Sequence, residues 1–315
     1  MISIVIPLYN EEENIDQLYT RLSNASSSWG DTYELILVDD GSYDNTPELL
    51  KKLSEEDARV KTIKLSRNFG HQAAISAGIK YAKGDAVVIM DGDLQDPPEK
   101  LSLFLDKWRE GYHVVYAIRK KRKEGLFKKL AYKVFYRLLS FISDIDIPLD
   151  SGDFCVMDKK VVKVLNREMT EHTRFVRGLR AYAGFKQIGV EYERDKRAAG
   201  EVKYTFRKLL KLALDGLLDF STFPLRIATY LGFLIAIPSF LAGVFFIVHR
   251  IVGFNVLGYS PSDTPGLASL AVGVFFLGGI MLIILGVIGE YIGRIYFEVK
   301  KRPFYIIDEI YNDKE

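Results

Sequence analysis

Residues 90–99 read Met-Asp-Gly-Asp-Leu-Gln-Asp-Pro-Pro-Glu and directly follow the apolar run Ala86-Val87-Val88-Ile89. The run predicts a buried strand that ends in two carboxylates one residue apart. Side chains alternate along a strand, so Asp91 and Asp93 share a face, or converge if the chain turns at Gly92. Hard oxygen ligands suit Mg²⁺ or Mn²⁺, which usually also takes oxygens from phosphates. The first expectation is therefore a divalent metal site that binds a diphosphate.

Strand-like and helix-like segments alternate over residues 1 to about 200. The expected strands are Ile2–Pro7, Tyr33–Val38, Val60–Leu65 and Ala86–Met90, and the expected helices are Asn10–Ser26, Thr46–Ala58 and His71–Ala82. This alternation predicts an α/β fold with a doubly wound, mostly parallel, Rossmann-like sheet.

Polar residues follow all four expected strands. They are Pro7-Leu8-Tyr9-Asn10-Glu11, Asp39-Asp40, Asn68-Phe69-Gly70-His71 and Asp91-Gly92-Asp93. Ligands of such sheets bind beyond the carboxyl ends of the strands. The coincidence at four strand ends predicts a binding site there more strongly than any single motif does.

The composition sets the broad class. The 315-residue chain is 48% hydrophobic, carries a formal net charge of +2 and has one cysteine, Cys155. A single cysteine excludes an intrachain disulfide and fits a reducing compartment. The first residues lack the basic start and long apolar core of a signal peptide. No nucleic-acid partner is expected.

Two long stretches contain no charged residue, Ile227–Val248 and Pro265–Gly289. At about 1.5 Å per residue, each can cross a hydrocarbon core of about 30 Å. A two-helix transmembrane hairpin is therefore expected over residues 227–289, with spans of about 227–249 and 265–289. Basic residues flank the hairpin on its outer sides, whereas the connecting loop holds only Arg250, together with His249 and Asp263. The positive-inside rule then places both termini in the cytoplasm.

Two further segments, Leu126–Ile142 and Phe206–Phe220, are amphipathic and basic. The first is either a core-facing helix or a helix on the membrane surface, and the second is expected to be interfacial because the chain must reach the bilayer there. The expected organisation is a cytoplasmic domain (1–205), an interfacial helix (206–226), the hairpin (227–289) and a cytoplasmic C-terminal tail (290–315). The expected location is the inner or plasma membrane.

The motifs resemble those of family 2 glycosyltransferases of the GT-A fold. More narrowly, they resemble polyprenyl-phosphate glycosyltransferases, the group of dolichyl-phosphate mannose synthase and the bactoprenol glucosyltransferases. The matching segments are Ile6–Glu11, Val38–Ser42, Leu65–Gln72, Asp91–Glu99, Ser151–Phe154 and Gly200–Tyr204.

The resemblance implies roles at the donor side of the site. Asp39 or Asp40 would accept a hydrogen bond from the base, and His71 would cap its helix or contact the nucleotide. Asp91 and Asp93, with the Gln95 amide oxygen, would hold Mg²⁺ or Mn²⁺ on the diphosphate. The implied nucleotide-sugar-binding residues are Pro7, Tyr9, Glu11, Asp39, Asp40, Asn68, His71, Asp91 and Gly92.

The resemblance also implies roles at the acceptor side. Asp153 is the candidate catalytic carboxylate, with Asp150 as the fallback and Asp93 beside it. A general base is barely required, because a monophosphate with a second pKa of about 6 is largely ionised at pH 7. Asp153 is therefore expected mainly to orient groups. The implied phosphate-binding residues are Arg119, Arg122, Arg197 and Lys203, although Val202 stands where Ser commonly precedes this lysine.

The implied reaction is an inverting transfer of a hexose, with UDP-glucose as the favoured donor, to polyprenyl (undecaprenyl) phosphate on the cytoplasmic face of the membrane. GDP-mannose or another nucleotide sugar is the alternative donor. A processive polysaccharide synthase is disfavoured, because neither Trp29 nor Trp108 belongs to a Gln-x-x-Arg-Trp segment. A non-enzymatic sugar-lipid membrane component is disfavoured by the intact Asp91–Glu99 segment. The resemblance implies a homo-oligomer, specifically a tetramer.

Overall fold

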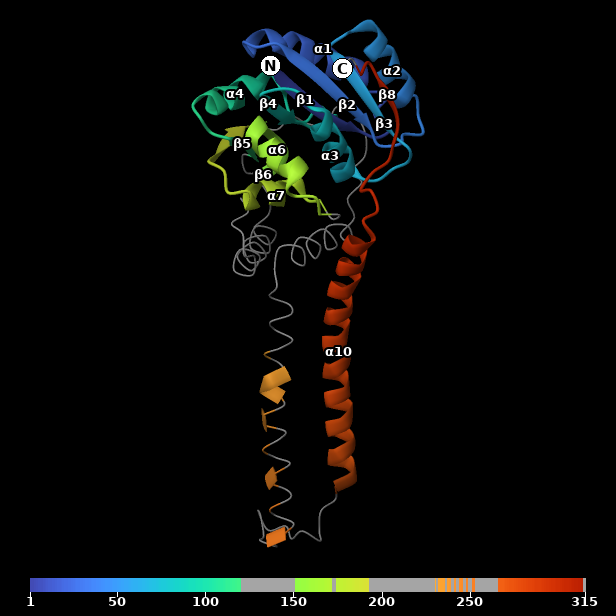
Figure 1. Ribbon diagram of the computed structural model, residues 1–315, viewed down its shortest axis with the longest axis vertical. Helices are drawn as coiled ribbons and strands as arrows, with labels where there is room; N and C mark the ends of the chain where they lie inside the picture. Colours follow the sequence, from blue (N-terminus) through green and yellow to red (C-terminus); the bar gives the residue numbers. More distant parts are fainter. Residues whose placement is uncertain are drawn as a thin grey trace, which may run out of the picture. The chain divides into compact units, whose positions relative to one another are not determined.

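The computed structural model describes residues 1–119, 151–171, 174–192 and 266–313, and scattered residues between 230 and 252. The chain divides into two compact units, Met1–Phe220 with Lys301–Glu315, and Ser221–Lys300. The first unit contains a sheet with helices, and the second contains a long helix (Figure 1).

In the described part of the first unit, a mixed sheet has the strand order β7-β5-β6-β4-β1-β2-β3-β8. The strands are β1 (Ile2–Leu8), β2 (Tyr33–Asp39), β3 (Val60–Leu65), β4 (Ala86–Ile89), β5 (Val114–Arg119), β6 (Ser151–Asp158), β7 (Gln187–Tyr192) and β8 (Ile307–Tyr311). The centre, from β4 through β1 and β2 to β3, is parallel. By contrast, β6 is antiparallel to both β4 and β5, and β8 is antiparallel to β3. The α/β prediction is confirmed, and the sheet is mixed.

Helices cover both faces of this sheet (Figure 1). They are α1 (Ile15–Ala25), α2 (Thr46–Glu56), α3 (His71–Tyr81), α4 (Leu101–Arg109), α6 (Lys159–Arg167) and α7 (Val176–Tyr182). Alternate strand residues feed two separate cores, as the period of a strand requires. Ile4 and Ile6 pack with residues of α1, α2 and α4, whereas Val5 packs with residues of α3, α6 and α7.

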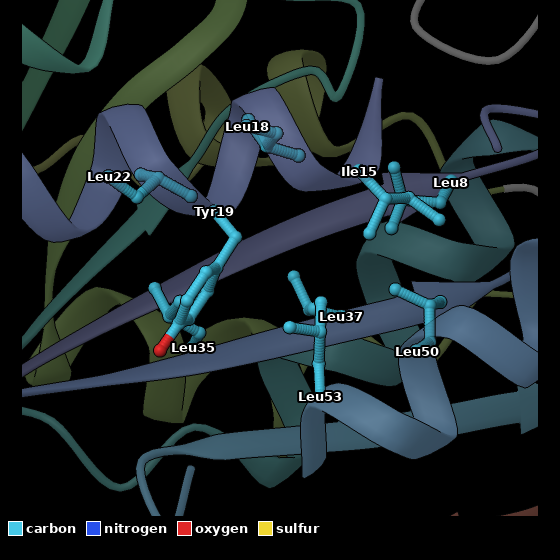
Figure 2. Close-up of a pocket in the computed structure, with 9 residues that line it drawn as sticks. All are labelled: Leu8, Ile15, Leu18, Tyr19, Leu22, Leu35, Leu37, Leu50 and Leu53. Carbon is cyan, nitrogen blue, oxygen red and sulfur yellow. The ribbon is translucent and has the colours of Figure 1, made fainter. Parts of the chain in front are cut away.

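A cavity of about 10 Å³ lies in the first of these cores (Figure 2). Its lining is almost wholly aliphatic: Leu8, Ile15, Leu18, Tyr19, Leu22, Leu35, Leu37, Leu50 and Leu53. A cavity of this size holds at most about one water molecule, and an aliphatic lining offers that water few partners. The cavity is a packing defect of the core and no ligand site.

The helix α1 begins later than the sequence predicts. The expected helix started at Asn10, but Asn10 has a φ of 52° and α1 begins at Ile15. The intervening loop is fastened to the loop after β2, where Asn10 N–H donates to Ser42 Oγ at 2.9 Å and Glu11 N–H donates to Thr46 Oγ1 at 3.0 Å. Asn10 and Glu11 therefore belong to the loop and not to the helix, because their backbone N–H groups donate to side chains that follow β2.

The C-terminal segment, expected only as a tail over residues 290–315, contains the end of a helix and a strand. The helix α10 (Gly266–Lys300) runs to Lys300, and β8 then pairs with β3. Two ion pairs hold this strand, Lys61–Asp313 at 2.7 Å and Lys64–Asp308 at 3.0 Å. An uncovered β3 edge would expose unpaired backbone groups, so β8 protects the sheet.

Among the described residues, one helical segment is long and apolar enough to cross a membrane, Phe276–Lys300 of α10, with a mean hydropathy of 2.0. Residues of the first predicted span, 227–249, lie largely outside the described part, and its described residues, such as 232–235, are helical. The two-span hairpin therefore stays a prediction. The amphipathic segments 126–142 and 206–226 also lie outside the described residues.

The packing of α3 on the sheet generates a test of the fold. A Cβ at Gly78 would overlap Val5 Cγ1 of β1 and lie 3.1 Å from Val38 Cγ2 of β2. Overpacking a core typically costs about 1–3 kcal/mol. We expect Gly78→Val to lower the free energy of unfolding by about 2 kcal/mol or more, measured by urea unfolding in detergent with tryptophan fluorescence.

The exposed Lys80 on the same helix provides the control. Lys80→Val should change the free energy of unfolding by no more than about 0.5 kcal/mol. Adding Val5→Ala to Gly78→Val should recover part of the loss, because it removes the overlapping methyl groups. A fully stable Gly78→Val variant would contradict the described contact between α3 and β1.

Candidate active site

The carboxyl ends of β1, β2, β3 and β4 and the amino end of β6 lie at one edge of the sheet. The antiparallel register of β4 and β6 pairs Ile89 with Cys155. Continuing this register by two residues places Asp91 opposite Asp153. Two predicted site residues far apart in the sequence are therefore neighbours because of strand pairing.

His71 lies between these two carboxylates. It is the first residue of α3, which follows Gly70 with a φ of 101°. Its Nε2 atom is 3.5 Å from Asp91 Oδ1 and 3.5 Å from Asp153 Oδ2. Burial alone would lower the pKa of His71, but the hydrogen bond to Asp153 and the charges of Asp91, Asp153 and Asp40 outweigh it and raise the pKa to about 9. The imidazole is therefore a cation at neutral pH.

The two carboxylates differ in their electrostatics. Burial raises the pKa of Asp91 to about 6, with His71 opposing the shift and neighbouring carboxylates adding to it. Burial alone would also raise the pKa of Asp153, but the charges of Arg177 and His71 outweigh it and hold that pKa well below its usual range. The pKa of Asp153 therefore lies below that of Asp91, and a carboxylate with so low a pKa is a weak proton acceptor.

Two arginines of α7 were missed by sequence reasoning. Arg177 Nη2 lies 3.2 Å from Asp153 Oδ1. The buried Arg180 donates from Nη2 to the Gly152 carbonyl at 3.2 Å and lies over the ring of Tyr116. Basic side chains on a short helix are usually solvated, so the spacing of residues 177 and 180 carried no signal by itself.

The predicted metal ligands lie directly after β4. Asp93 is buried, and its Oδ1 accepts the Gln95 backbone N–H at 3.1 Å. Within the part of the chain that the structure describes, no group of three or more His, Cys, Asp or Glu side chains is arranged as a metal site. The donor chemistry nevertheless fits a hard divalent cation, because Asp91 and Asp93 offer carboxylate oxygens. Burial first, and then the neighbouring carboxylates, raise the pKa of Asp91, and a bound cation would offset both effects.

The paired aspartates after β2 have different partners. Asp40 accepts the backbone N–H groups of Phe69 at 2.8 Å and Gly70 at 2.9 Å, so its carboxylate is committed to the loop that precedes α3. Asp39 Oδ1 accepts the Ser42 N–H at 3.1 Å, whereas its buried Oδ2 has no hydrogen-bond partner among the described residues. Burial raises the pKa of both groups. Of the two, Asp39 retains a buried acceptor atom with no hydrogen-bond partner among the described residues.

The predicted nucleoside-pocket residues in β1 and the loop after it differ in burial. Pro7 is buried within β1, whereas Tyr9 and Glu11 are half-buried in the following loop. The ring of Tyr9 meets the ring of Tyr43 edge-on, with centroids 6.3 Å apart. Glu11 Oε2 accepts the side-chain N–H of Asn14 at 2.6 Å. Tyr9 thus lies at the same edge as Asp39, with an aromatic neighbour that the sequence did not single out.

Local packing accounts for the positions of two residues that were predicted to bind the nucleotide sugar, Gly92 and Asn68. A Cβ at Gly92 would overlap Leu8 Cδ2, so packing against β1 already requires glycine there. Gly41 has a φ of 68°, and a Cβ on it would lie 2.6 Å from the backbone nitrogen of Asn68. Asn68 is therefore held where the loops after β2 and β3 meet.

Four predicted residues, Asp150, Arg122, Arg197 and Lys203, lie outside the described residues. Arg119 ends β5, where it pairs with Tyr192 of β7, so its backbone is at the same edge of the sheet as Asp91. The Tyr192 hydroxyl donates to Asp96, which ties the end of β7 to the loop after β4. The roles of all these side chains stay predictions.

Comparison with known proteins shows close relatives. Residues 3–165 match the family model described as glycosyl transferase family 2. The chain is 51% identical over 310 residues to the uncharacterized glycosyltransferase YkcC of Bacillus subtilis, covering 98% of this chain and 94% of the relative. It is 45% identical to an uncharacterized glycosyltransferase of Synechocystis, with 98% and 95% covered. It is 41% identical to the bactoprenol glucosyl transferase of Shigella phage SfII, with 97% of each chain covered.

The charge on His71 generates a pH test. The folded-state pKa of about 9 lies above the ordinary 6.5. The stabilisation from the charged imidazole is therefore fully present below about pH 6.5 and is lost as the pH rises through about 9. We expect the difference in Tm between the wild type and His71→Gln to shrink steadily from pH 6.5 to 9.5, measured with EDTA present.

The Asp153→Asn background provides the matched comparison. Removing that charge should move the fall of the His71 contribution to lower pH. A Tm difference that does not vary between pH 6.5 and 9.5 would contradict the charged contact of His71 with Asp91 and Asp153.

Proposed function

The chain belongs to glycosyl transferase family 2, and we propose that it transfers a hexose from a nucleotide sugar, with UDP-glucose as the favoured donor, to polyprenyl phosphate at a membrane surface. The observation that carries the proposal is the convergence of His71, Asp91 and Asp153 at the carboxyl edge of the sheet. Ligands of open α/β sheets bind at this edge.

The acceptor follows from two lines of support. The bactoprenol glucosyl transferase of phage SfII is similar to this chain over nearly its full length. The segment Phe276–Lys300 is long and apolar enough to cross a membrane. A lipid phosphate acceptor requires an enzyme that works at the membrane, and a catalytic unit joined to a membrane helix meets this need. The catalytic unit is proposed to face the cytoplasm.

The donor nucleotide is proposed to lie over the ends of β1 and β2. Asp39 Oδ2, which is buried and has no hydrogen-bond partner among the described residues, is the proposed acceptor for a base N–H, because the Asp40 carboxylate is committed to Phe69 and Gly70. The half-buried Tyr9 offers an aromatic face beside it. This assignment prefers Asp39 over Asp40, a choice that the sequence left open.

The diphosphate is proposed to lie over the loop after β4. Asp91 and Asp93, with the Gln95 amide oxygen, would hold Mg²⁺ or Mn²⁺ there, and the bound ion would neutralise charge on the leaving nucleoside diphosphate. The protonated His71 adds a cationic donor next to Asp91. A preorganised positive charge at the place where negative charge develops is a major source of rate enhancement.

The transfer is a single displacement in this proposal. An oxygen of the acceptor phosphate attacks the anomeric carbon from the face opposite the diphosphate. The bond from that carbon to the diphosphate oxygen breaks, the nucleoside diphosphate leaves, and the configuration inverts. The attacking oxygen is largely ionised at pH 7, so no strong base is needed. The low pKa of Asp153 fits a role in orienting groups.

A product assay tests this function. The full-length protein is incubated with undecaprenyl phosphate, Mn²⁺ or Mg²⁺ and a panel of UDP- and GDP-sugars, and products are identified by mass spectrometry. We expect one hexose per lipid phosphate, and a loss of at least about 10²-fold in kcat for Asp91→Asn. Asp16→Asn, an exposed carboxylate on α1, is the control and should keep full activity.

Transfer to no lipid phosphate from any of these donors would exclude the proposed function. Full activity of Asp91→Asn would exclude the proposed position of the diphosphate. Activity with GDP-mannose alone would keep the reaction and replace the favoured donor.

The two aspartates after β2 provide a second test. Asp39→Asn replaces the proposed acceptor by an amide, so we expect the KM for the nucleotide sugar to rise about 10- to 100-fold, as a hydrogen bond to a charged group is worth about 1.5–3 kcal/mol. Asp40→Asn should instead lower the Tm, because it weakens the bonds to Phe69 and Gly70. The reverse pattern would assign the base to Asp40.

A further inference from the structure

Both oxygens of the Asp153 carboxylate are held by cationic side chains. His71 Nε2 lies 3.5 Å from Oδ2, and Arg177 Nη2 lies 3.2 Å from Oδ1. The Asp153 side chain is only 17% exposed, so solvent screens these contacts weakly. A carboxylate held on both sides has little freedom to turn toward a substrate hydroxyl or phosphate.

The helix that carries Arg177 is itself tied to this site. The Val176 N–H at the start of α7 donates to the Gln72 side-chain oxygen of α3 at 3.0 Å. Arg180, one turn later, donates to the Gly152 carbonyl at 3.2 Å. The start of α3, the start of β6 and α7 are therefore linked in a closed set of contacts, with Gln72 next to His71 and Gly152 next to Asp153.

These contacts form a chain that leads from Arg177 to the proposed position of the diphosphate. Arg177 touches Asp153, Asp153 touches His71, and His71 touches Asp91 at the proposed diphosphate position. Arg177 is half-buried, with its side chain 27% exposed and its guanidinium also 5.6 Å from the ring centre of Phe175. Its place is thus fixed by packing as well as by charge, as a supporting residue requires.

We propose that Arg177 is a positioning residue: it fixes the Asp153 carboxylate, which in turn keeps the His71 imidazole against Asp91. The inference rests on the proposed function, since it assigns His71 and Asp91 to the leaving-group side of the transfer. In this inference Arg177 acts through its contact with Asp153 and not on the reacting atoms directly.

The first experiment compares Arg177→Gln with the wild type in steady-state transfer by the full-length protein. Misplacing a catalytic group by about 1 Å costs about 10²-fold in rate. We expect kcat to fall about 10- to 100-fold, while the KM values for the nucleotide sugar and for undecaprenyl phosphate change less than about threefold. Arg167→Gln, an exposed arginine on α6, is the matched control and should keep the wild-type kcat.

A double-mutant cycle with Asp153→Asn tests whether Arg177 acts through Asp153. In the Asp153→Asn background, Arg177→Gln should lower kcat by less than about threefold, because the carboxylate that it positions is absent. Arg177→Lys keeps a point charge near Oδ1 and should recover at least about threefold of the lost kcat. If the kcat of Asp153→Asn is no higher than the background rate, the double-mutant cycle has no readable second step. The recovery of kcat by Arg177→Lys, at an unchanged Tm, then decides whether Arg177 acts through its charge on Asp153.

Three results would overturn the inference. In the first, Arg177→Gln and Asp153→Asn lower kcat by factors that multiply in the double variant. In the second, a folded Arg177→Lys variant recovers none of the lost kcat. The third is a KM for undecaprenyl phosphate that rises more than tenfold with kcat unchanged, because that pattern assigns Arg177 to the acceptor phosphate.

The failure of the proposed function has a different signature. Donor hydrolysis by water is measured beside lipid transfer. A wild type that hydrolyses the donor without lipid transfer overturns the acceptor, and the same cycle is then run on hydrolysis. A wild type that transfers normally while Arg177→Gln keeps full kcat overturns the inference alone.

Discussion

The contact of the His71 imidazole with the carboxylates of Asp91 and Asp153 is the interaction on which the site depends. Strand pairing makes the two carboxylates neighbours, and neighbouring negative charges repel each other. The imidazole, 3.5 Å from each, supplies the opposite charge between them. Arg177 adds a second cation on the far oxygen of Asp153. The edge of the sheet thus places two cationic side chains against two carboxylates, and of these two carboxylates Asp91 has the higher pKa.

The fold makes this arrangement possible because it keeps the cluster rigid. Two cores, one on each face of the sheet, hold the central strands, and α3 lies on the face opposite α1 and α2. The loops that leave the strands are bonded to one another, as Asn10 is to Ser42 and Asp40 to Phe69 and Gly70. Groups held this way lose little entropy when a ligand binds, which favours both affinity and rate.

The sequence was sufficient for the parallel centre of the sheet and for most residues at its edge. The expected strands Ile2–Pro7 and Val60–Leu65 agree with β1 and β3 within one residue, because their apolar runs are long and bounded by polar turns. The strand β8 was missed, because Ile307–Tyr311 is short and carries two acidic residues. The role of Asp40 in the loop before α3, and the contacts of Arg177, depend on neighbours distant in sequence, which local patterns do not encode. Prediction from motifs therefore found the carboxylates and His71, and it missed Arg177, the second cation beside Asp153.

The most direct measurement is a structure of the full-length protein with UDP and Mn²⁺. The account predicts the base against Asp39 and Tyr9, the diphosphate and the ion over Asp91 and Asp93, and Asp153 still held between His71 and Arg177. A nucleotide bound away from the carboxyl edge of the sheet, or an ion with no contact to Asp91 or Asp93, would contradict the account.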